Sequence, residues 1–377
     1  MGTEPLGGRP DHGVDHGRHD VGRHEVGRHE VGRHDVGRHE VDRSAADRSG
    51  TLGEVGERAI IAMFTSAVGH RPESSSGSDI VIGSGDDAAV FDVGPTVIST
   101  DTAVQDRHFR LEWSGAAQIG ARTVVQSAAD IAAMGGRTTG VVVALACPPQ
   151  TTVGWLADLN TGIVDAAHRL GARVLGGDLV AADEIVVSIT SVGALDGLAP
   201  VTLSGARAGD VLAVSGPLGT AAAGFAVVSR SGVAPMARWQ RDADPRATVV
   251  SAFLLPAPDL SQGVLAARAG AHAMTDISDG LVEELRTMAS SSGVSLAVTG
   301  DAVPRCAEVD HVAALLGADA RTWALTGGED HELLASFAPG AVPPGWTEIG
   351  EVRPGPARVT IDGADIAGLS GWRAFDR

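Results

Sequence analysis

Apolar positions follow two different periods after residue 50, and this alternation predicts a chain of mixed strands and helices. Short apolar runs at 141–146 and 185–193 are typical of buried strands. Apolar residues recur at helical spacing over 116–134 and 152–170, which predicts two helices among those strands. The turn-rich segment 194–210 then leads into a second half of the same mixed order. The pattern therefore predicts a two-domain α/β or α+β protein.

The second half repeats the mixture of elements around a loop rich in Pro and charge at about 231–259. Its predicted strands lie at 211–214, 273–274, 294–298 and 323–325, and its predicted helices begin at 220, 280 and 308. We assign residues 51–200 to an N-terminal α/β domain and residues 201–377 to a C-terminal α/β domain. Residues 1–50 form a separate tail in this interpretation.

The tail is defined by a five-residue unit, Gly-Arg-His-Asp/Glu-Val, that repeats five times between Gly17 and Val41. A period of five matches neither a helix nor a strand. The tail contains no aromatic residue and one Leu, so it cannot bury a core, and we expect it to be disordered. The alternative is weak metal binding by its repeated histidines, which are His19, His24, His29, His34 and His39.

Charge and composition exclude several classes of function. The chain carries 29 basic and 47 acidic residues, a formal charge of −18, which argues against nucleic-acid binding. It contains no Lys, which excludes a Walker A loop, a Schiff-base enzyme and a protein-kinase site. The two cysteines lie far apart and indicate neither a zinc site nor a disulfide framework. The sequence shows no signal peptide or apolar segment of membrane length, so we expect a cytoplasmic protein without membrane contact.

Carboxylates follow several of the predicted strands, each beside Gly, Ser or Thr. These acidic positions are Asp101, Asp178, Asp276, Asp279 and Glu329, with Asp86 and Asp87 in a further turn and Asp130 in a predicted helix. Any one of them could be a helix cap or a solvated loop residue. If several converge, each pair at 4 Å repels by about 4 kcal/mol at an effective dielectric of 20. Divalent cations remove that repulsion, and all-oxygen ligands favour Mg²⁺ or Mn²⁺, which commonly bind together with phosphates.

Seven short motifs occur in the order seen in a known enzyme family. They are Gly85-Asp86-Asp87-Ala88-Ala89, Ser99-Thr100-Asp101, His108-Phe109, Asp130-Ile131-Ala132-Ala133-Met134-Gly135, Gly176-Gly177-Asp178, Asp276-Ile277-Ser278-Asp279-Gly280-Leu281 and Gly327-Gly328-Glu329-Asp330. In this order the chain resembles thiamine-monophosphate kinase, within the superfamily of aminoimidazole-ribonucleotide synthetase. The resemblance spans about residues 52–375. It implies a two-domain fold of that superfamily and a homodimer in which the N-terminal sheets pair.

The resemblance also implies an activity and a site. The implied reaction transfers a phosphoryl group from ATP to thiamine monophosphate and gives thiamine diphosphate, with several Mg²⁺ ions held mainly by the N-terminal domain. The implied metal ligands are Asp87, Ser99, Thr100, Asp101, Asp130, Asp178, Asp276 and Asp279, of which Asp101, Asp130 and Asp279 would be catalytic. The implied ATP contacts are Gly177, Asp178 and Ser278, and the implied thiamine-monophosphate contacts are His108, Glu329 and Trp372.

Two positions depart from the family pattern. Ser127 stands where the family usually has Asn, and Leu203 stands where it usually has an Arg that contacts ATP. The second change removes a phosphate donor, for which Arg207 is a candidate substitute.

Three other functions stay open at this point. The chain could be another ATP-using enzyme of the superfamily, or a non-catalytic protein that binds nucleotide or thiamine phosphate. A Mg²⁺-dependent phosphatase is the third, and only the acidic positions favour it.

Overall fold

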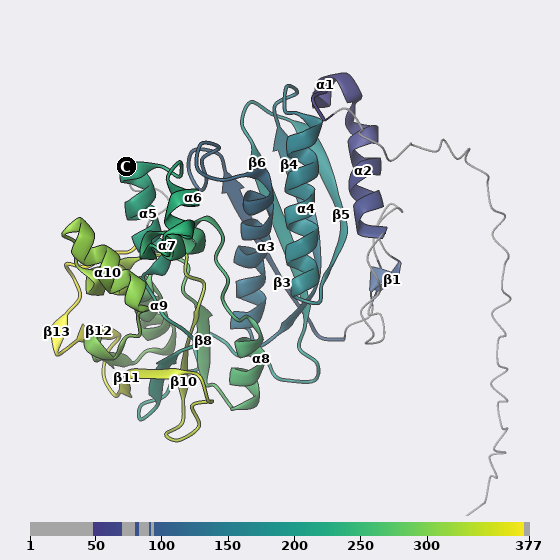
Figure 1. The fold of residues 1–377 in the computed structure, drawn as a ribbon. Coiled ribbons are helices and arrows are strands. Elements are labelled where there is room, and N and C mark those ends of the chain that lie inside the picture. Colours follow the sequence, from purple (N-terminus) through teal and green to yellow (C-terminus); the bar gives the residue numbers. More distant parts are fainter. Residues whose placement is uncertain (1–47, 70–79, 83–89, 92–93, 373–377) are drawn as a thin grey trace, which may run out of the picture. The chain divides into compact units, whose positions relative to one another are not determined.

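A computed structural model describes residues 48–69, 80–82, 90–91 and 94–372 of the chain (Figure 1). Almost all of the predicted tail and the acidic turn with Asp86 and Asp87 lie outside the described residues. The predicted fold class is confirmed, because the chain contains helices together with two larger mixed sheets, of four and seven strands, and one two-stranded sheet. None of the described helices is both long and apolar enough to cross a membrane.

The first sheet has four strands in the order β3-β6-β4-β5. The strands are β3 (Thr96–Val104), β4 (Arg137–Cys147), β5 (Arg173–Ala181) and β6 (Val186–Ala194). β6 pairs antiparallel with both β3 and β4, and β4 pairs parallel with β5. Two further short strands, β1 (Ile80–Ile82) and β2 (Val90–Phe91), form a hairpin of their own. The predicted strands at 141–146 and 185–193 are therefore confirmed.

Helices α3 (Ala116–Ala133) and α4 (Val153–Arg169) lie side by side over one face of this sheet (Figure 1). Helices α1 (Leu52–Val55) and α2 (Glu57–Gly69) precede them, and α2 packs beside α4 and β5. Gly120 and Gly162 let α3 and α4 come close. A Cβ on Gly120 would lie 2.3 Å from the Leu159 carbonyl oxygen, and one on Gly162 would lie 2.0 Å from that of Ala117. The small residues of α3 thus serve a tight helix–helix contact.

The second sheet has seven strands in the order β13-β12-β9-β11-β7-β10-β8. The strands are β7 (Val211–Val214), β8 (Ala273–Asp276), β9 (Ser295–Val298), β10 (Leu333–Phe337), β11 (Thr347–Arg353), β12 (Arg358–Ile361) and β13 (Ala364–Asp365). Its helices are α5 (Thr220–Ser231), α6 (Met236–Arg241), α7 (Pro245–Leu254), α8 (Ser261–Arg268), α9 (Leu281–Ser292), α10 (Ala307–Leu316) and α11 (Ala320–Thr326). The domain boundary near residue 200 stays a prediction.

Two predictions for the second half were wrong. Residues 323–325 belong to helix α11 instead of a strand, because Asp319 accepts hydrogen bonds from the backbone N–H groups of Arg321 and Thr322 and starts a helix there. The segment 231–259 is not one loop, because it contains α6 and α7. Asp244 caps α7 and Pro245 fills its first turn, which is a good helix start despite the Pro and charge content.

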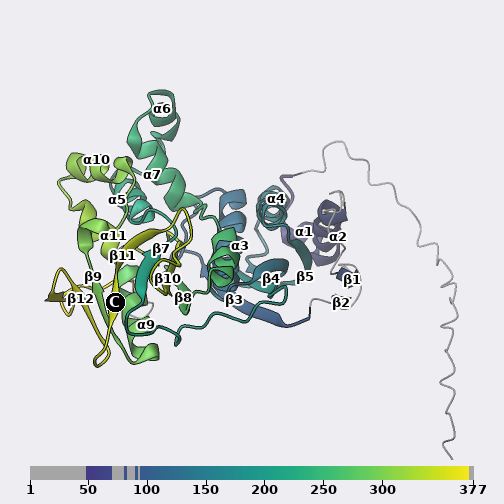
Figure 2. The same cartoon turned by 90° about the horizontal axis from the view of Figure 1, so that it is seen from below.

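Helix α3 connects the two sheets. It packs against β3, β4 and β6 of the first sheet and against β8 of the second, as the view from below shows (Figure 2). The side chains of Ala128, Ala129 and Ala132 on this helix share a buried cluster with Met274 of β8. The interface between the sheets is therefore built on small residues, and the polar positions of α3 can reach both sheets.

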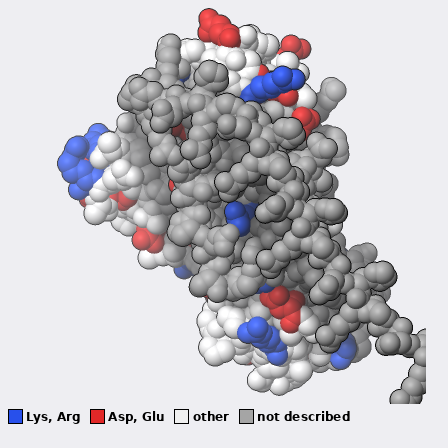
Figure 3. Space-filling model, turned by 90° about the vertical axis from the view of Figure 1, so that its right-hand side faces the viewer, with Lys and Arg blue, Asp and Glu red and all other residues white. Residues whose placement is uncertain are grey.

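Arg and acidic side chains of the described residues lie in small scattered groups on the face shown in Figure 3.

Candidate functional site

Three carboxylates from three elements meet beside α3. Asp101 lies on β3, Asp130 lies in the last turn of α3, and Asp276 ends β8. Ser99 lies two residues before Asp101, on the same face of β3, and its hydroxyl donates a hydrogen bond to the Asp130 carboxylate. The sheet thus presents Ser99 and Asp101 to the helix that carries Asp130.

We call Asp101, Asp130 and Asp276 the acidic group. Burial and mutual repulsion raise the pKa values of two of its members. Burial, with the negative charge of Asp276 next, raises the pKa of Asp130 to about 6. The same two causes raise the pKa of Asp101. These carboxylates therefore face one another without enough positive charge between them, which is the arrangement that a divalent cation stabilises.

The loop after β8 and the helix α9 that follows it add one acid each. Burial, and then the charges of Glu329 and Asp276, raise the pKa of Asp279. Glu284, in the first turn of α9, accepts a hydrogen bond from the Asp279 backbone N–H at 3.3 Å. Burial, followed by the charge of Asp276, raises the pKa of Glu284 to about 8. Sequence reasoning missed Glu284, because an acid in a first helical turn is usually a dipole partner.

Glu329 ties the second sheet to α3. Its carboxylate forms an ion pair with Arg122 at 2.7 Å and accepts a hydrogen bond from Gln126 at 2.8 Å. Burial alone would raise the pKa of Glu329, but the charge of Arg122 and a hydrogen bond from His331 hold it well below its usual range. Arg122 and Gln126 are one helical turn apart on α3, so one face of the helix holds this carboxylate.

His331 is a site residue that sequence reasoning also missed. Its Nδ1 lies 3.1 Å from an Asp276 oxygen, and its Nε2 lies 3.3 Å from a Glu329 oxygen. Burial alone would lower the pKa of His331, but these two bonds raise it to about 10. The ring is therefore a buried cation between two carboxylates. Its position directly after Glu329-Asp330 was the one available signal in the sequence.

The three residues expected to contact thiamine monophosphate line one cavity of about 520 Å³. They are His108, Glu329 and Trp372. The Val104 backbone N–H donates to His108 Nδ1 at 3.1 Å, so the neutral ring carries its proton on Nε2. The Trp372 backbone N–H donates to the Asp279 carbonyl oxygen at 2.9 Å, which fixes the C-terminal segment beside the acidic loop.

Aromatic rings form one wall of this cavity. Trp113, Phe225 and Phe253 contact one another edge to face or tilted, with ring centroids 5.6 to 6.1 Å apart. Arg110 stacks on Trp113 at 4.6 Å from the ring centroid. The cavity therefore combines an aromatic wall with both kinds of charge, the Glu329 carboxylate and the side chains of Arg107, Arg110 and Arg122, a lining that suits a ligand with a flat ring and an anionic group.

Other predicted site residues lie away from the acidic group. Asp178 and Gly177 are on β5, the edge of the first sheet opposite to β3. In the strand register Thr100 and Asp178 share the sheet face that α3 and α4 leave uncovered, whereas Asp101 points to the α3 face. Within one chain Thr100 and Asp178 therefore do not join Asp130. Ser278 lies in the loop between Asp276 and Asp279, and its carbonyl oxygen accepts from the Glu329 N–H at 2.8 Å.

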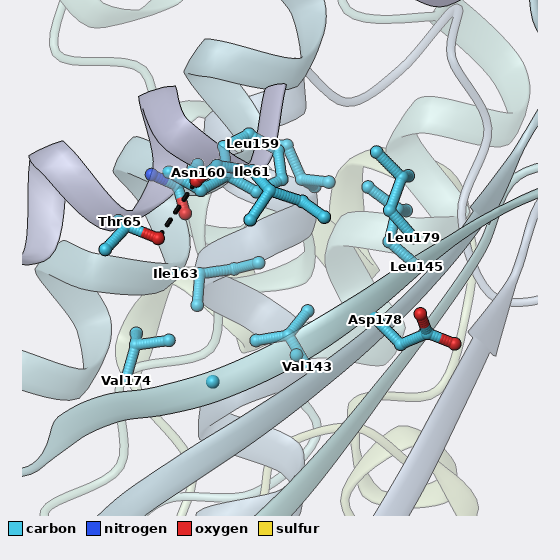
Figure 4. Close-up of a pocket in the computed structure, with 13 residues that line it drawn as sticks. Ile61, Thr65, Val143, Leu145, Leu159, Asn160, Ile163, Val174, Asp178 and Leu179 are labelled. Carbon is cyan, nitrogen blue, oxygen red and sulfur yellow. Dashed lines mark hydrogen bonds between the residues drawn. The ribbon is translucent and has the colours of Figure 1, made fainter. Parts of the chain in front are cut away.

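Gly177 and Asp178 border a smaller apolar cavity of about 70 Å³ between α2, α4 and the sheet (Figure 4). Ile61, Leu159 and Ile163 surround it, and the carboxylate of Asp178 points away from them (Figure 4).

The residues at the two positions that depart from the family pattern, Ser127 and Leu203, both make contacts in the structure. The buried Ser127 hydroxyl donates to the Ile189 carbonyl oxygen at 3.0 Å and so fixes α3 on β6. Leu203 packs against the core of the second sheet. The guanidinium of Arg207 lies 3.3 Å from His272 Nε2. Arg207 therefore already has a partner, and its role as a substitute phosphate donor stays a prediction.

The donor set of the acidic group fits Mg²⁺. Its ligands are carboxylate and hydroxyl oxygens, and the raised pKa values of Asp101, Asp130 and Asp279 show that a positive charge would stabilise it. No three acidic, His or Cys side chains in the described ranges are close enough to hold a cation by themselves. Mg²⁺ usually keeps several waters and binds through one or two carboxylates plus substrate phosphates, so such closeness is not required.

Known proteins share both halves of this fold. A family profile described as AIR synthase related protein, N-terminal domain, matches residues 85–195. A second, described as AIR synthase related protein, C-terminal domain, matches residues 207–362. The chain is 43% identical over 330 residues to thiamine-monophosphate kinase of Mycobacterium tuberculosis, a match that covers 87% of this chain and 94% of the relative.

Two solved structures resemble the chain. Thiamine-monophosphate kinase from Stenotrophomonas maltophilia K279a is 29% identical, with a TM-score of 0.70 over 81% of this chain and 96% of its own. AaThiL complexed with AMPPCP and TMP is 25% identical, with a TM-score of 0.67 over 86% of this chain and 98% of its own.

Proposed function

The chain belongs to the thiamine-monophosphate kinase family, and we propose that it transfers a phosphoryl group from ATP to thiamine monophosphate, giving thiamine diphosphate. The observation that carries the proposal is the continuity of the two halves of the site. Glu329 lines the 520 Å³ cavity, and His331 links it to Asp276 of the acidic group. An acceptor held in the cavity would therefore present its phosphate beside the carboxylates.

The cavity supports a thiamine phosphate as the acceptor. Thiamine monophosphate carries flat rings and an anionic phosphate, and the cavity offers aromatic side chains together with Arg107 and Arg110. Glu329 supplies a negative charge at the same wall, which is held by Arg122 and Gln126. His108 Nε2–H is a fixed donor for a neutral ring nitrogen of the acceptor. These groups would select and orient the acceptor.

Mg²⁺ would be held by Asp101, Asp130, Asp276 and Asp279, with Ser99 supporting Asp130. When bound, Mg²⁺ neutralises the phosphate charges of donor and acceptor and stabilises the charge that develops in transfer. The protein itself holds these carboxylates on three elements that share a packed interface. Because the acceptor oxygen of a phosphate is already anionic, the chain needs no strong general base. Its contribution is orientation and exclusion of water.

We place ATP at the edge strand β5, beside Gly177 and Asp178, which also border the apolar cavity (Figure 4). Gly177 allows β5 to pair closely with β4, since a Cβ there would lie 2.3 Å from the Val143 carbonyl oxygen. Asn160 and Thr65 are the uncharged polar side chains among the apolar residues that line this cavity.

A homodimer would bring Asp178 to the acidic group. Ile98, Val142 and Val180 on the uncovered face of the first sheet are 63%, 38% and 49% exposed, which supports burial of this face against a second copy. β3 and β5 are the two edges of the sheet. If two such sheets face each other around a twofold axis, Asp178 of the partner subunit comes beside Asp101, and ATP lies near the interface.

Mixing the protein with Mg²⁺-ATP and thiamine monophosphate tests the proposal. Formation of thiamine diphosphate together with ADP supports the kinase. Loss of the monophosphate without ATP would instead support a phosphatase, and binding without turnover would support a non-catalytic binding protein. Turnover with a different acceptor only would support another enzyme of the superfamily. We expect the enzyme to act in the cytoplasm, where its co-substrate ATP is supplied.

A further inference from the structure

His331 occupies the point where the acidic group and the substrate cavity touch. Its side chain is 3% exposed, and its two ring nitrogens face different carboxylates. Nδ1 faces Asp276, which does not line the cavity, and Nε2 faces Glu329, which does. One ring therefore spans from a proposed metal ligand to a proposed substrate contact.

The backbone around this ring is held in an unusual conformation. Glu329 and His331 have φ values of +70° and +54°, a left-handed region that is unfavourable for a non-Gly residue. The His331 N–H donates to the Ile277 carbonyl oxygen at 3.0 Å, so this segment runs along the loop after β8. Between the two residues, the Asp330 carboxylate accepts from the Gly219 and Ala221 N–H groups at 2.6 and 2.8 Å. Many contacts thus hold the ring in one place.

We infer that His331 is a positioning residue that couples the metal-binding carboxylate Asp276 to the substrate-binding carboxylate Glu329. The inference rests on the proposed function. His331 fixes Asp276 through its Oδ2 and leaves Oδ1 of Asp276 for a cation. It contacts the same Glu329 oxygen, Oε2, that the α3 residues Arg122 and Gln126 hold. A change at Asp276 is then transmitted to the cavity through the ring.

A double-mutant cycle on thiamine-monophosphate binding tests this coupling. The variants are His331→Gln, Asp276→Ala and both together, and the dissociation constant is measured in EDTA without ATP, by quenching of tryptophan fluorescence. We expect His331→Gln to weaken binding by about 10-fold. Asp276→Ala should weaken it by about 3-fold or more although Asp276 lies outside the cavity, and the double variant should bind like His331→Gln alone. Additive effects, or an unchanged dissociation constant in either single variant, would overturn the inference.

The matched control is His272→Gln. His272 also pairs with a buried aspartate, Asp210, at 2.9 Å, but it lies outside the cavity and the acidic group. This variant should lose stability without a change in the dissociation constant. In turnover, His331→Gln should raise both the KM for thiamine monophosphate and the Mg²⁺ concentration needed for half-maximal rate, whereas His272→Gln should change neither.

The coupling can still be tested if a variant does not fold or if the wild type needs Mg²⁺ to bind. If His331→Gln does not fold, Asp276→Ala alone decides, since unchanged binding in that variant removes the coupling. If the wild type binds only with Mg²⁺, the whole cycle is measured at saturating Mg²⁺, and additive effects again overturn the inference. A wild-type chain that neither binds nor phosphorylates thiamine monophosphate would reject the proposed function, whereas normal wild-type turnover with an additive cycle would reject only the coupling.

Discussion

Asp130 is subject to two opposing demands in the metal-free protein. Burial and the charge of Asp276 favour its protonated form, while binding of a cation requires its carboxylate form. The folded pKa of about 6 lies above the unfolded value of 3.8, so this group stabilises the metal-free fold at low pH. That stability is lost as the pH rises from about 4 through about 6. Mg²⁺ at the proposed site would reverse the balance, because it would bind the charged form.

The first prediction concerns Mg²⁺ affinity and pH. The affinity should rise with pH through about 6 and then level off, being about 10-fold weaker at pH 5 than at pH 8 through this one group. Titration calorimetry in two buffers of different ionisation enthalpy should also show proton release on binding at pH 5.5. An affinity that falls with increasing pH would contradict the assignment of Asp130.

The second prediction concerns turnover of Asp130→Asn. The variant keeps the shape of the side chain and removes one negative charge from the acidic group that we propose binds Mg²⁺. Turnover should therefore fall by about 100-fold or more. Its melting temperature in EDTA at pH 8 should equal or exceed that of the wild type, because a repulsive charge is gone. Near-normal turnover in a folded variant would remove Asp130 from the mechanism.

Some residues of the candidate site could be predicted from the sequence, and others could not. Asp101, Asp130 and Asp276 were predictable because an acid after a buried strand, or among small residues of a helix, is conspicuous. Arg122 and His331 were not, since each acts through a partner far away in sequence, Glu329 or Asp276. An Arg in an apolar helix and a His beside two acids have common structural explanations. Only the fold shows that they meet.

Helix α3 is the element on which the site depends most. Strong periodicity and small residues made it predictable, whereas α11 was mistaken for a strand because a short apolar run fits both periods. The cap at Asp319 was the signal that distinguished them. The packing of α3 on α4 was not predictable in detail, because it depends on which glycines face each other.

The third prediction concerns this helix contact. Gly120→Ala should lower the stability by about 1–3 kcal/mol, because the added Cβ would lie 2.3 Å from the Leu159 carbonyl oxygen and must push the helices apart. Gly368→Ala is the control, since no atom lies within 4 Å of a Cβ there and its φ is not positive. Thermal unfolding measures both. Equal melting temperatures for the two variants would show that α3 and α4 can separate without cost.

At the scale of the whole molecule, two questions are where the N-terminal tail ends and whether a second copy of the chain completes the site. The described part of the chain begins at Arg48, which forms an ion pair with Asp158 at 2.5 Å, and the Gly50 carbonyl oxygen accepts from the Val153 N–H at 2.8 Å. The sequence placed the end of the tail at residue 50, a boundary that falls within these contacts. Long-range contacts of this kind have no signature in a local pattern.

The fourth prediction concerns the tail. A shortened chain that begins at residue 47 should keep its melting temperature and kinase activity. A chain that begins at Thr51 loses Arg48 and Gly50, and its melting temperature should fall by about 2–4 °C. Thermal unfolding and the product assay compare both with the full chain. Loss of activity in the longer of the two would show that residues 1–46 take part in the reaction.

The fifth prediction concerns the dimer. Val142→Asp puts a charge on the uncovered face of the first sheet and should give a monomer in analytical ultracentrifugation, with turnover lowered by about 10-fold or more, because Asp178 of the partner subunit is lost from the site. Leu315→Asp is the control, since Leu315 on α10 is 55% exposed on a different element. A monomeric wild type of full activity would contradict this arrangement.

Arg122, Gln126 and Asp130 are spaced four residues apart on α3, so they lie in one row along the helix. At 1.5 Å per residue, the row runs about 6 Å from Gln126 and about 12 Å from Arg122, which both hold the Glu329 carboxylate, to Asp130 at the proposed cation site. A helix is a stiff rod, and this one therefore acts as a ruler between the two ends of the reaction. A fixed spacing of this kind would favour an acceptor whose phosphate reaches the acidic group when its ring lies in the cavity, so the enzyme would choose its acceptor by length as much as by chemistry.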